Sequence, residues 1–142
     1  MSQSYIVWAR RTPMGKLAGG LASVRTDDLL TCVFEDFKKW ASFDLKEIDD
    51  VVVGCANQAG EDNRNVARMG VLLAGLPYEV PAATVNRLCG SSLEAIADAY
   101  AKIEAKMADC ILVGGVESMS RGPYVLSKAE SEFDRGQKMY DS

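Results

Sequence analysis

The stretch A-A-T-V-N-R-L-C-G-S-S-L-E-A-I, residues 82–96, joins a strand pattern to a helix pattern, and the rest of the chain follows the same alternation. Its first four residues form a short apolar run after Pro81, which predicts a buried strand. Apolar residues then recur along one helical face, at Leu93, Ile96, Ala97, Tyr100 and Ile103. Cys89 therefore lies in the turn where a strand ends and a helix begins.

This position of Cys89 suits a reactive thiol. The first backbone N–H groups of a helix have no partner within the helix, and the helix dipole is positive at that end. Both effects stabilise a thiolate, which is the nucleophilic form of cysteine. The small residues Gly90, Ser91 and Ser92 follow, so the turn can close tightly and leave the sulfur accessible, as in a nucleophile elbow. The alternative is a buried structural thiol, which is the commoner use of cysteine.

The segments around this stretch predict an α/β fold. Strands are predicted over residues 5–9, 51–55, 82–85 and 108–113, with helices over 26–40, over 65–74 and after Cys89. Residues 5–9 are apolar on both faces, which is typical of a buried parallel strand. The order βαβαβαβ predicts a mixed, mostly parallel sheet with layered helices. Cys89 and Gly114-Gly115 both follow strands, at the edge where such sheets bind ligands.

Composition excludes several classes of function. The chain has 142 residues, 48% hydrophobic and 25% charged, with a net charge of -4, so nothing favours binding to nucleic acid or to an anionic membrane. No apolar run approaches the length of a membrane span, and the first residues do not resemble a signal peptide. We therefore expect a cytoplasmic protein. The sequence contains no His, so a cysteine nucleophile needs a base from elsewhere.

The other cysteines are expected to be structural. Cys32, Cys55 and Cys110 fit no zinc-binding spacing, and a cytoplasmic chain favours free thiols over disulfides. No metal site is predicted. Arg64 and Arg68 lie one helical turn apart and could hold carboxylates or phosphates, although a solvated or salt-bridged face is the simpler interpretation.

Several of these stretches resemble the thiolase family. The run N-R-L-C-G-S-S-L-E-A-I, residues 86–96, is similar to the acyl-enzyme signature of that family, whose Cys is acylated by an acyl-CoA. Many thiolases have Gly at Ser92 and Gln at Glu94, and Glu94 is expected to be a first-turn acidic residue. The blocks R-T-P (11–13) and G-G-V-E-S-M-S (114–120) are also similar to thiolases. The run over 54–69 resembles the 3-oxoadipyl-CoA branch of the family.

The resemblance implies an incomplete thiolase-like N-terminal core half over residues 1–122, with 123–142 as the poorly ordered start of a loop domain. The implied activity is an acyltransferase that cleaves a 3-oxoacyl-CoA, here 3-oxoadipyl-CoA to succinyl-CoA and acetyl-CoA, through a Cys89 acyl-enzyme. Coenzyme A is then a co-substrate, and no cofactor is bound. The resemblance assigns no substrate-binding residue and no role to Glu117 or Ser118.

The family also implies partners. Thiolases take a catalytic His and a second Cys from a C-terminal half, so this chain is expected to need that half or another thiolase subunit and to be inactive alone. A homodimer or homotetramer is expected for the full length. The alternatives are a non-catalytic or partner-dependent half-thiolase and a β-ketoacyl synthase, which shares the Cys elbow. A thiol-redox domain is disfavoured because the chain has no C-x-x-C.

Overall fold

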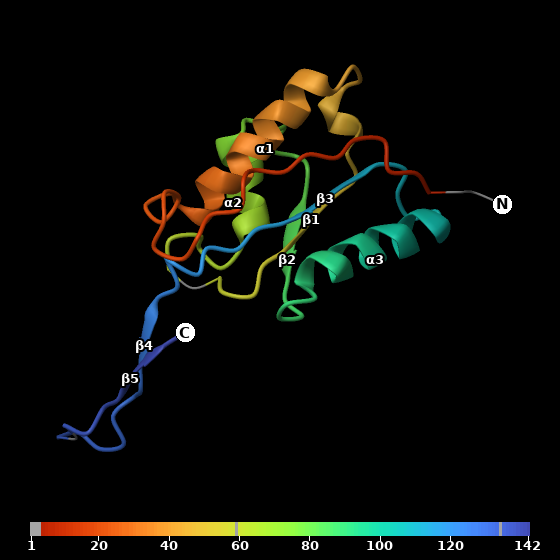
Figure 1. Ribbon diagram of the computed structural model, residues 1–142. Coiled ribbons are helices and arrows are strands. Elements are labelled where there is room, and N and C mark those ends of the chain that lie inside the picture. Colours follow the sequence, from red (N-terminus) through yellow and green to blue (C-terminus); the bar gives the residue numbers. More distant parts are fainter. Residues whose placement is uncertain (1–3, 59, 134) are drawn as a thin grey trace.

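The computed structural model describes residues 4–58, 60–133 and 135–142, and a parallel sheet of three strands lies at its centre (Figure 1). β1 (Asp50–Gly54) is the middle strand. β2 (Ala82–Val85) and β3 (Ile111–Gly115) flank it, and both run parallel to it. This sheet, with helices layered on it, confirms the predicted α/β fold.

The register of the strands places their carboxyl ends at one edge of the sheet. Gly54 at the end of β1 pairs with Val85 on one side and with Gly115 on the other. The segment D-V-V-V-G of β1 has three consecutive buried valines, since layers of helix cover both faces of the middle strand. Loops that leave this edge are therefore neighbours in space, although they are far apart in the sequence.

Helices cover both faces of the sheet (Figure 1). α1 (Thr26–Trp40) and α2 (Val66–Leu73) lie together on one face, and α3 (Ser91–Glu104) lies on the other. A short 3-10 helix, η1 (Leu45–Glu47), precedes β1. Apart from this turn, the described order of elements up to β3 is αβαβαβ, which is one strand short of the predicted βαβαβαβ.

The hydrophobic core lies between the sheet and the α1–α2 pair. Leu30, Phe34 and Phe37 recur at helical spacing on α1, and all three are buried in this core. α2 crosses them closely at Gly70, where an added Cβ would lie 2.7 Å from the Leu30 side chain. Asn65 caps α2, because its side chain accepts a hydrogen bond from the Arg68 N–H.

The apolar face predicted for α3 does not face the sheet. Leu93, Ile96 and Tyr100 are 71%, 44% and 59% exposed, whereas Ala95 and Ala99 are buried. Small residues therefore form the contact with β1 and β3, because they allow the helix axis to approach the sheet closely. The larger apolar side chains of α3 form an uncovered surface on the opposite side of the helix.

Residues 5–9 were predicted to form a buried strand, and this prediction is wrong for the described structure. The segment belongs to no strand, and Ile6 and Val7 are 81% and 76% exposed. A strand needs a neighbouring edge to complete its hydrogen bonds, and no described strand lies beside this segment. Only Trp8 is partly buried: it packs edge-on against Phe37 of α1, with ring centroids 5.3 Å apart.

The strand predicted over residues 108–113 begins three residues later, at Ile111. The Asp49 side chain accepts hydrogen bonds from the backbone N–H groups of Asp109 and Cys110, at 2.7 and 3.0 Å. The Asp49 N–H in turn donates to Cys110 O at 2.9 Å, so both the side chain and the backbone of Asp49 hold these two residues. Strand pairing with β1 begins directly after them.

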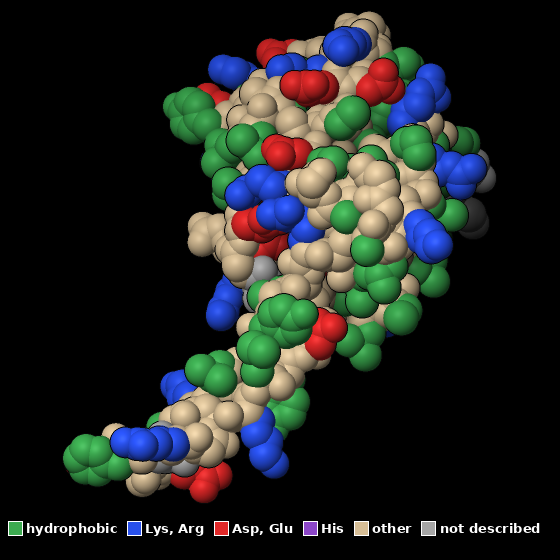
Figure 2. All heavy atoms as spheres, turned by 60° about the vertical axis from the view of Figure 1, so that its left-hand side comes forward, with side chains coloured by type: hydrophobic (Ala, Val, Ile, Leu, Met, Phe, Trp, Pro, Cys, Tyr) green, Lys and Arg blue, Asp and Glu red, His purple; other side chains and the backbone are tan. Residues whose placement is uncertain are grey.

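The tail over residues 123–142, predicted to be the start of a loop domain, contains an antiparallel hairpin of β4 (Tyr124–Leu126) and β5 (Met139–Asp141). The hairpin projects from the body (Figure 1), and hydrophobic side chains are visible along it in the space-filling view (Figure 2). All its paired residues are exposed. Asn57 contacts Ser142 by two hydrogen bonds of 3.0 and 3.3 Å. The proposed boundary of a loop domain at residue 123 stays a prediction.

Candidate active site

Cys89 lies in the tight turn between β2 and α3, at the carboxyl edge of the sheet. Its thiol is free and exposed, and Gly90 is the N-cap of α3. Two backbone hydrogen bonds close the turn, from Gly90 N–H to Arg87 O and from Ser91 N–H to Leu88 O, both 3.0 Å. No hydrogen bond to a described residue has the Cys89 N–H as its donor. The predicted strand–turn–helix setting of this Cys is therefore present.

Ser91 holds the turn from the inside. It is buried, its Oγ accepts a hydrogen bond from the Arg87 N–H at 2.9 Å, and the same hydroxyl donates to Leu88 O at 2.6 Å. From sequence, Ser91 counted only as a small residue beside Cys89. Its position in the first turn of a predicted helix was the available signal, because Ser hydroxyls bond to nearby backbone groups at such positions.

Asn86 fixes the beginning of the same turn. Its Oδ1 accepts a hydrogen bond from the Leu88 N–H at 2.9 Å, and its Nδ2 donates to Ala56 O at 2.9 Å. Leu88 has a φ of 49°, in the left-handed region that bulky side chains disfavour. The turn that presents Cys89 is therefore strained and held by side chains from within it.

Two glycines allow α3 to begin directly above the ends of β1 and β3. A Cβ on Gly54 would lie 2.3 Å from the backbone of Ser91 and Ser92, and a Cβ on Gly115 would lie 1.7 Å from Ser92 Oγ. Neither distance is possible for a real side chain. Gly115 therefore serves helix packing, whereas the sequence indicated only that it follows a strand at the edge where such sheets bind ligands.

Glu117 and Cys55 lie at the same edge. The Glu117 carboxylate accepts hydrogen bonds from the backbone N–H groups of Ala56 and Asn57, at 2.8 and 3.2 Å. Cys55 is 1% exposed, with its Sγ 3.8 Å from Glu117 Oε1. Burial and the nearby Glu117 charge raise the pKa of the Cys55 thiol to about 12. Cys55 is therefore a packed, structural thiol, as predicted.

The two remaining cysteines have different surroundings. Cys110 packs against the core and is partly buried, and burial raises the pKa of its thiol. Cys32 was expected to be structural, but it is exposed on α1. Within the described part of the chain, no group of His, Cys, Asp or Glu side chains could hold a metal ion.

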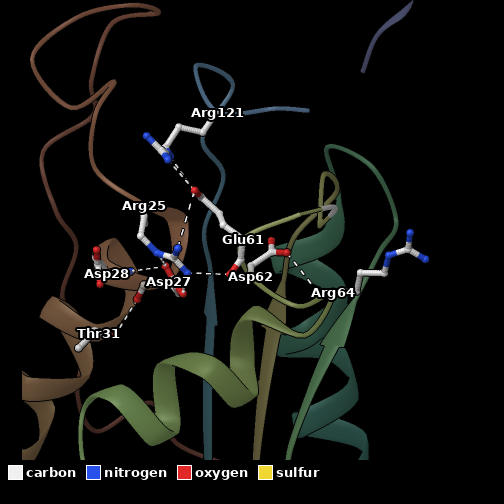
Figure 3. A network of polar contacts seen from close by, with 8 residues as sticks. All are labelled: Arg25, Asp27, Asp28, Thr31, Glu61, Asp62, Arg64 and Arg121. Atoms are coloured by element: carbon white, nitrogen blue, oxygen red, sulfur yellow. Dashed lines mark hydrogen bonds and ion pairs between the residues drawn. The ribbon is translucent and has the colours of Figure 1, made fainter. Parts of the chain in front are cut away.

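A network of charged side chains holds the loops behind this edge together (Figure 3). Arg25 donates to both oxygens of the fully buried Asp27, at 2.9 and 2.6 Å, and also to Glu61 O. Arg121 donates to both carboxylate oxygens of Glu61, at 2.6 and 2.5 Å. These hydrogen bonds lower the pKa of both carboxyl groups. The network fixes the loops that leave β1 and β3 against the beginning of α1.

Arg64 and Arg68 do not converge on a common ligand. Arg68 donates to Val80 O and Tyr78 O, at 2.8 and 2.9 Å, and is therefore a structural residue. The Arg64 side chain is exposed and points away from the network in Figure 3. Glu94, expected to be a first-turn acidic residue, lies in the first turn of α3 and pairs with Arg87 at 2.7 Å.

On the face shown in Figure 2, positive and negative side chains are mixed over the body of the molecule. None of the helices in the described ranges is both long and apolar enough to span a membrane.

Comparison with known proteins shows what this arrangement is similar to. The model of the thiolase N-terminal domain matches residues 4–141. The chain is 59% identical to a beta-ketoadipyl-CoA thiolase of Acinetobacter baylyi and 50% identical to a 3-oxoadipyl-CoA/3-oxo-5,6-dehydrosuberyl-CoA thiolase of Escherichia coli. Each match covers 100% of this chain and 36% of the relative. The chain thus spans about a third of the length of these relatives.

The fold agrees with this result. The crystal structure of the Bacillus anthracis acetyl-CoA acetyltransferase superposes with a TM-score of 0.83 at 30% sequence identity, over 92% of this chain and 33% of the other. The described structure is therefore part of a thiolase fold, with the sheet and helices of a partial half-domain. From the family match and from these relatives, we conclude that the chain belongs to the thiolase family.

Proposed function

We propose that this chain carries the nucleophile of a thiolase that cleaves 3-oxoadipyl-CoA. The observation that carries the proposal is the setting of Cys89: an exposed thiol one residue before the N-cap of α3, with its own N–H unbonded to any described residue. The preference for 3-oxoadipyl-CoA is supported by two relatives, the beta-ketoadipyl-CoA thiolase and the 3-oxoadipyl-CoA/3-oxo-5,6-dehydrosuberyl-CoA thiolase, which are 59% and 50% identical over the whole chain.

In the proposed reaction, the Cys89 thiolate attacks the 3-keto carbon of 3-oxoadipyl-CoA. The bond between C2 and C3 then breaks, its electron pair stays on C2, and C2 takes a proton as acetyl-CoA leaves. A succinyl group remains on Cys89 as a thioester. The thiolate of free coenzyme A attacks this thioester, so that succinyl-CoA leaves and Cys89 is regenerated. The Cys89 N–H is a suitable donor to the oxyanion of each addition step.

The proton transfers need groups that these residues do not supply. The chain has no His, and a Cys nucleophile is usually activated by one. We propose that a C-terminal thiolase segment, or another thiolase subunit, supplies the base, the second Cys and most of the surface for coenzyme A. Coenzyme A acts as co-substrate with no bound cofactor, and the complete enzyme is a cytoplasmic homodimer or homotetramer.

The second candidate function is a non-catalytic or partner-dependent half-thiolase without activity of its own; these residues contain no His, and a Cys nucleophile is usually activated by one. A β-ketoacyl synthase is less well supported, because the relatives named here are thiolases and an acetyltransferase.

The test follows the acyl-enzyme directly. The chain is incubated with 3-oxoadipyl-CoA, with and without a C-terminal thiolase segment, and cysteine peptides are analysed by mass spectrometry. We expect a succinyl adduct on Cys89 only when the C-terminal segment is present. Cys89→Ala should abolish the adduct, whereas Cys32→Ala, which removes another exposed thiol, should leave it unchanged. An adduct on Cys55 would contradict the assignment.

A further inference from the structure

We propose that Glu117 is a positioning residue for Cys89, acting through the loop over residues 55–57 and through Asn86. The inference rests on the proposed function only in taking Cys89 as the nucleophile. The carboxylate of Glu117, which follows β3, is inferred to hold the conformation of the Cys89 turn, which follows β2. The connection passes through the loop that follows β1, the middle strand.

The first link is between Glu117 and the loop. One carboxylate oxygen accepts the Ala56 N–H at 2.8 Å, and the other accepts the Asn57 N–H at 3.2 Å. Two successive backbone N–H groups thus converge on one side chain. A carboxylate satisfies both at once, whereas an amide side chain offers one oxygen and one donor.

The second link is between the loop and the turn. The peptide oxygen of Ala56 accepts a hydrogen bond from Asn86 Nδ2 at 2.9 Å. The other end of the Asn86 amide accepts the Leu88 N–H at 2.9 Å. A continuous series of hydrogen bonds therefore runs from the Glu117 carboxylate to the residue before Cys89.

The series of hydrogen bonds ends at Leu88, where it stabilises an unfavourable backbone conformation. Its φ of 49° is unfavourable for a leucine, so the turn keeps this shape only while its hydrogen bonds hold. Ser91 restrains the turn from the side of α3, by bonds to Arg87 N–H and Leu88 O. Asn86 restrains it from the side of β1, and Glu117 decides where Asn86 finds its acceptor.

The test compares amide hydrogen exchange in the 142-residue chain, its Glu117→Gln and Asn86→Asp variants, and the double variant. Glu117→Gln removes one acceptor and should speed exchange about fivefold at Ala56 or Asn57. Because the links are in series, it should also speed exchange at Leu88 by about twofold to fivefold. Asn86→Asp keeps the acceptor for the Leu88 N–H but loses the donor to Ala56 O. It therefore removes the hydrogen bond between the turn and the loop and keeps the hydrogen bond within the turn.

The double variant shows whether Glu117 acts on Leu88 through Asn86, which we call a relay, or whether Glu117 and Asn86 each affect only their own neighbours. In the Asn86→Asp background, Glu117→Gln should have no further effect at Leu88, while its effect at Ala56 and Asn57 persists. Reciprocally, Asn86→Asp alone should speed exchange at Asn57. Unchanged exchange at Leu88 in Glu117→Gln, or an equal effect in both backgrounds, would overturn the proposal.

Two further measurements keep the result interpretable. Circular dichroism of each variant reports global unfolding, which labelling of Cys55 would not, because the loop held by Glu117 covers that thiol. If Glu117→Gln unfolds, the effect of Asn86→Asp at Asn57 decides the question instead. In a complete thiolase, Glu117→Gln should lower kcat more than it raises KM.

None of the exchange measurements requires acyl transfer. An intact relay without a Cys89 adduct would therefore refute only the proposed function, and an adduct without a relay would refute only this inference.

Discussion

Cys55 and Cys89 follow neighbouring parallel strands at the same edge of one sheet, yet their surroundings are opposite. After β1, the chain turns into the loop held by Glu117, and this loop covers the Cys55 thiol. After β2, the chain turns directly into α3, so Cys89 stays exposed beside the first N–H groups of a helix. The difference shows that the segment after a strand, and not the strand itself, decides what a thiol at this edge can do.

The largest expected effect is on alkylation of these two thiols. A thiol with a pKa of about 12 is almost completely protonated at about pH 8, and the Cys55 thiol is also covered. Cys89 should therefore react with iodoacetamide at least about a hundredfold faster than Cys55, measured by peptide mass spectrometry. Cys32, an exposed thiol on α1, is the internal control for reagent access. Equal alkylation rates for Cys55 and Cys89 would contradict the difference in exposure between the two thiols.

The next largest effect is expected at Gly54, which directly precedes Cys55 and also contacts the beginning of α3 after Cys89. Gly54→Ala places a Cβ against the Ser91–Ser92 backbone, where it would lie 2.3 Å away. Because that neighbour is backbone, we expect α3 to shift and the free energy of unfolding to fall by about 3 kcal/mol, measured by urea titration. Gly20→Ala is the matched control, since nothing lies within 4 Å of its Cβ. If both variants lost the same stability, the close contact of α3 with β1 would not be supported.

The smallest effect is the pH dependence that Cys55 contributes. Folding raises the pKa of this thiol from 9.0 to about 12, so its stabilising contribution is complete below about pH 9. As the pH rises further, the unfolded chain loses the proton first. We therefore expect a loss of about 1 kcal/mol by about pH 10.

Urea titrations at about pH 8 and pH 10 measure this loss. Cys55→Ala should reduce the difference in the free energy of unfolding between the two pH values. A pH dependence unaffected by Cys55→Ala would show that the Cys55 thiol is not protected by the fold.

Local patterns predicted much of this structure. The apolar runs that became β1 and β2, and the periodicities that became α1 and α2, were recognised within a few residues. The strand–turn–helix setting of Cys89 was also predicted, because it depends on a short contiguous stretch. The strand predicted over residues 5–9 is absent because a strand forms only where the edge of another strand pairs with it, which a short contiguous stretch does not determine. The apolar stripe on α3 was real, but its direction depends on which face small residues present to the sheet.

The sequence by itself determined the α/β alternation, the placement of Cys89 before a helix and the resemblance to thiolases, because these are properties of contiguous residues. Only the tertiary structure decided which loop covers Cys55, that Gly54 and Gly115 admit α3, and that Glu117, Asn86 and Ser91 support the Cys89 turn. The physical reason is that parallel strands bring loops from distant parts of the chain to one edge. Hydrogen bonds and contacts between those loops have no signature in any single segment.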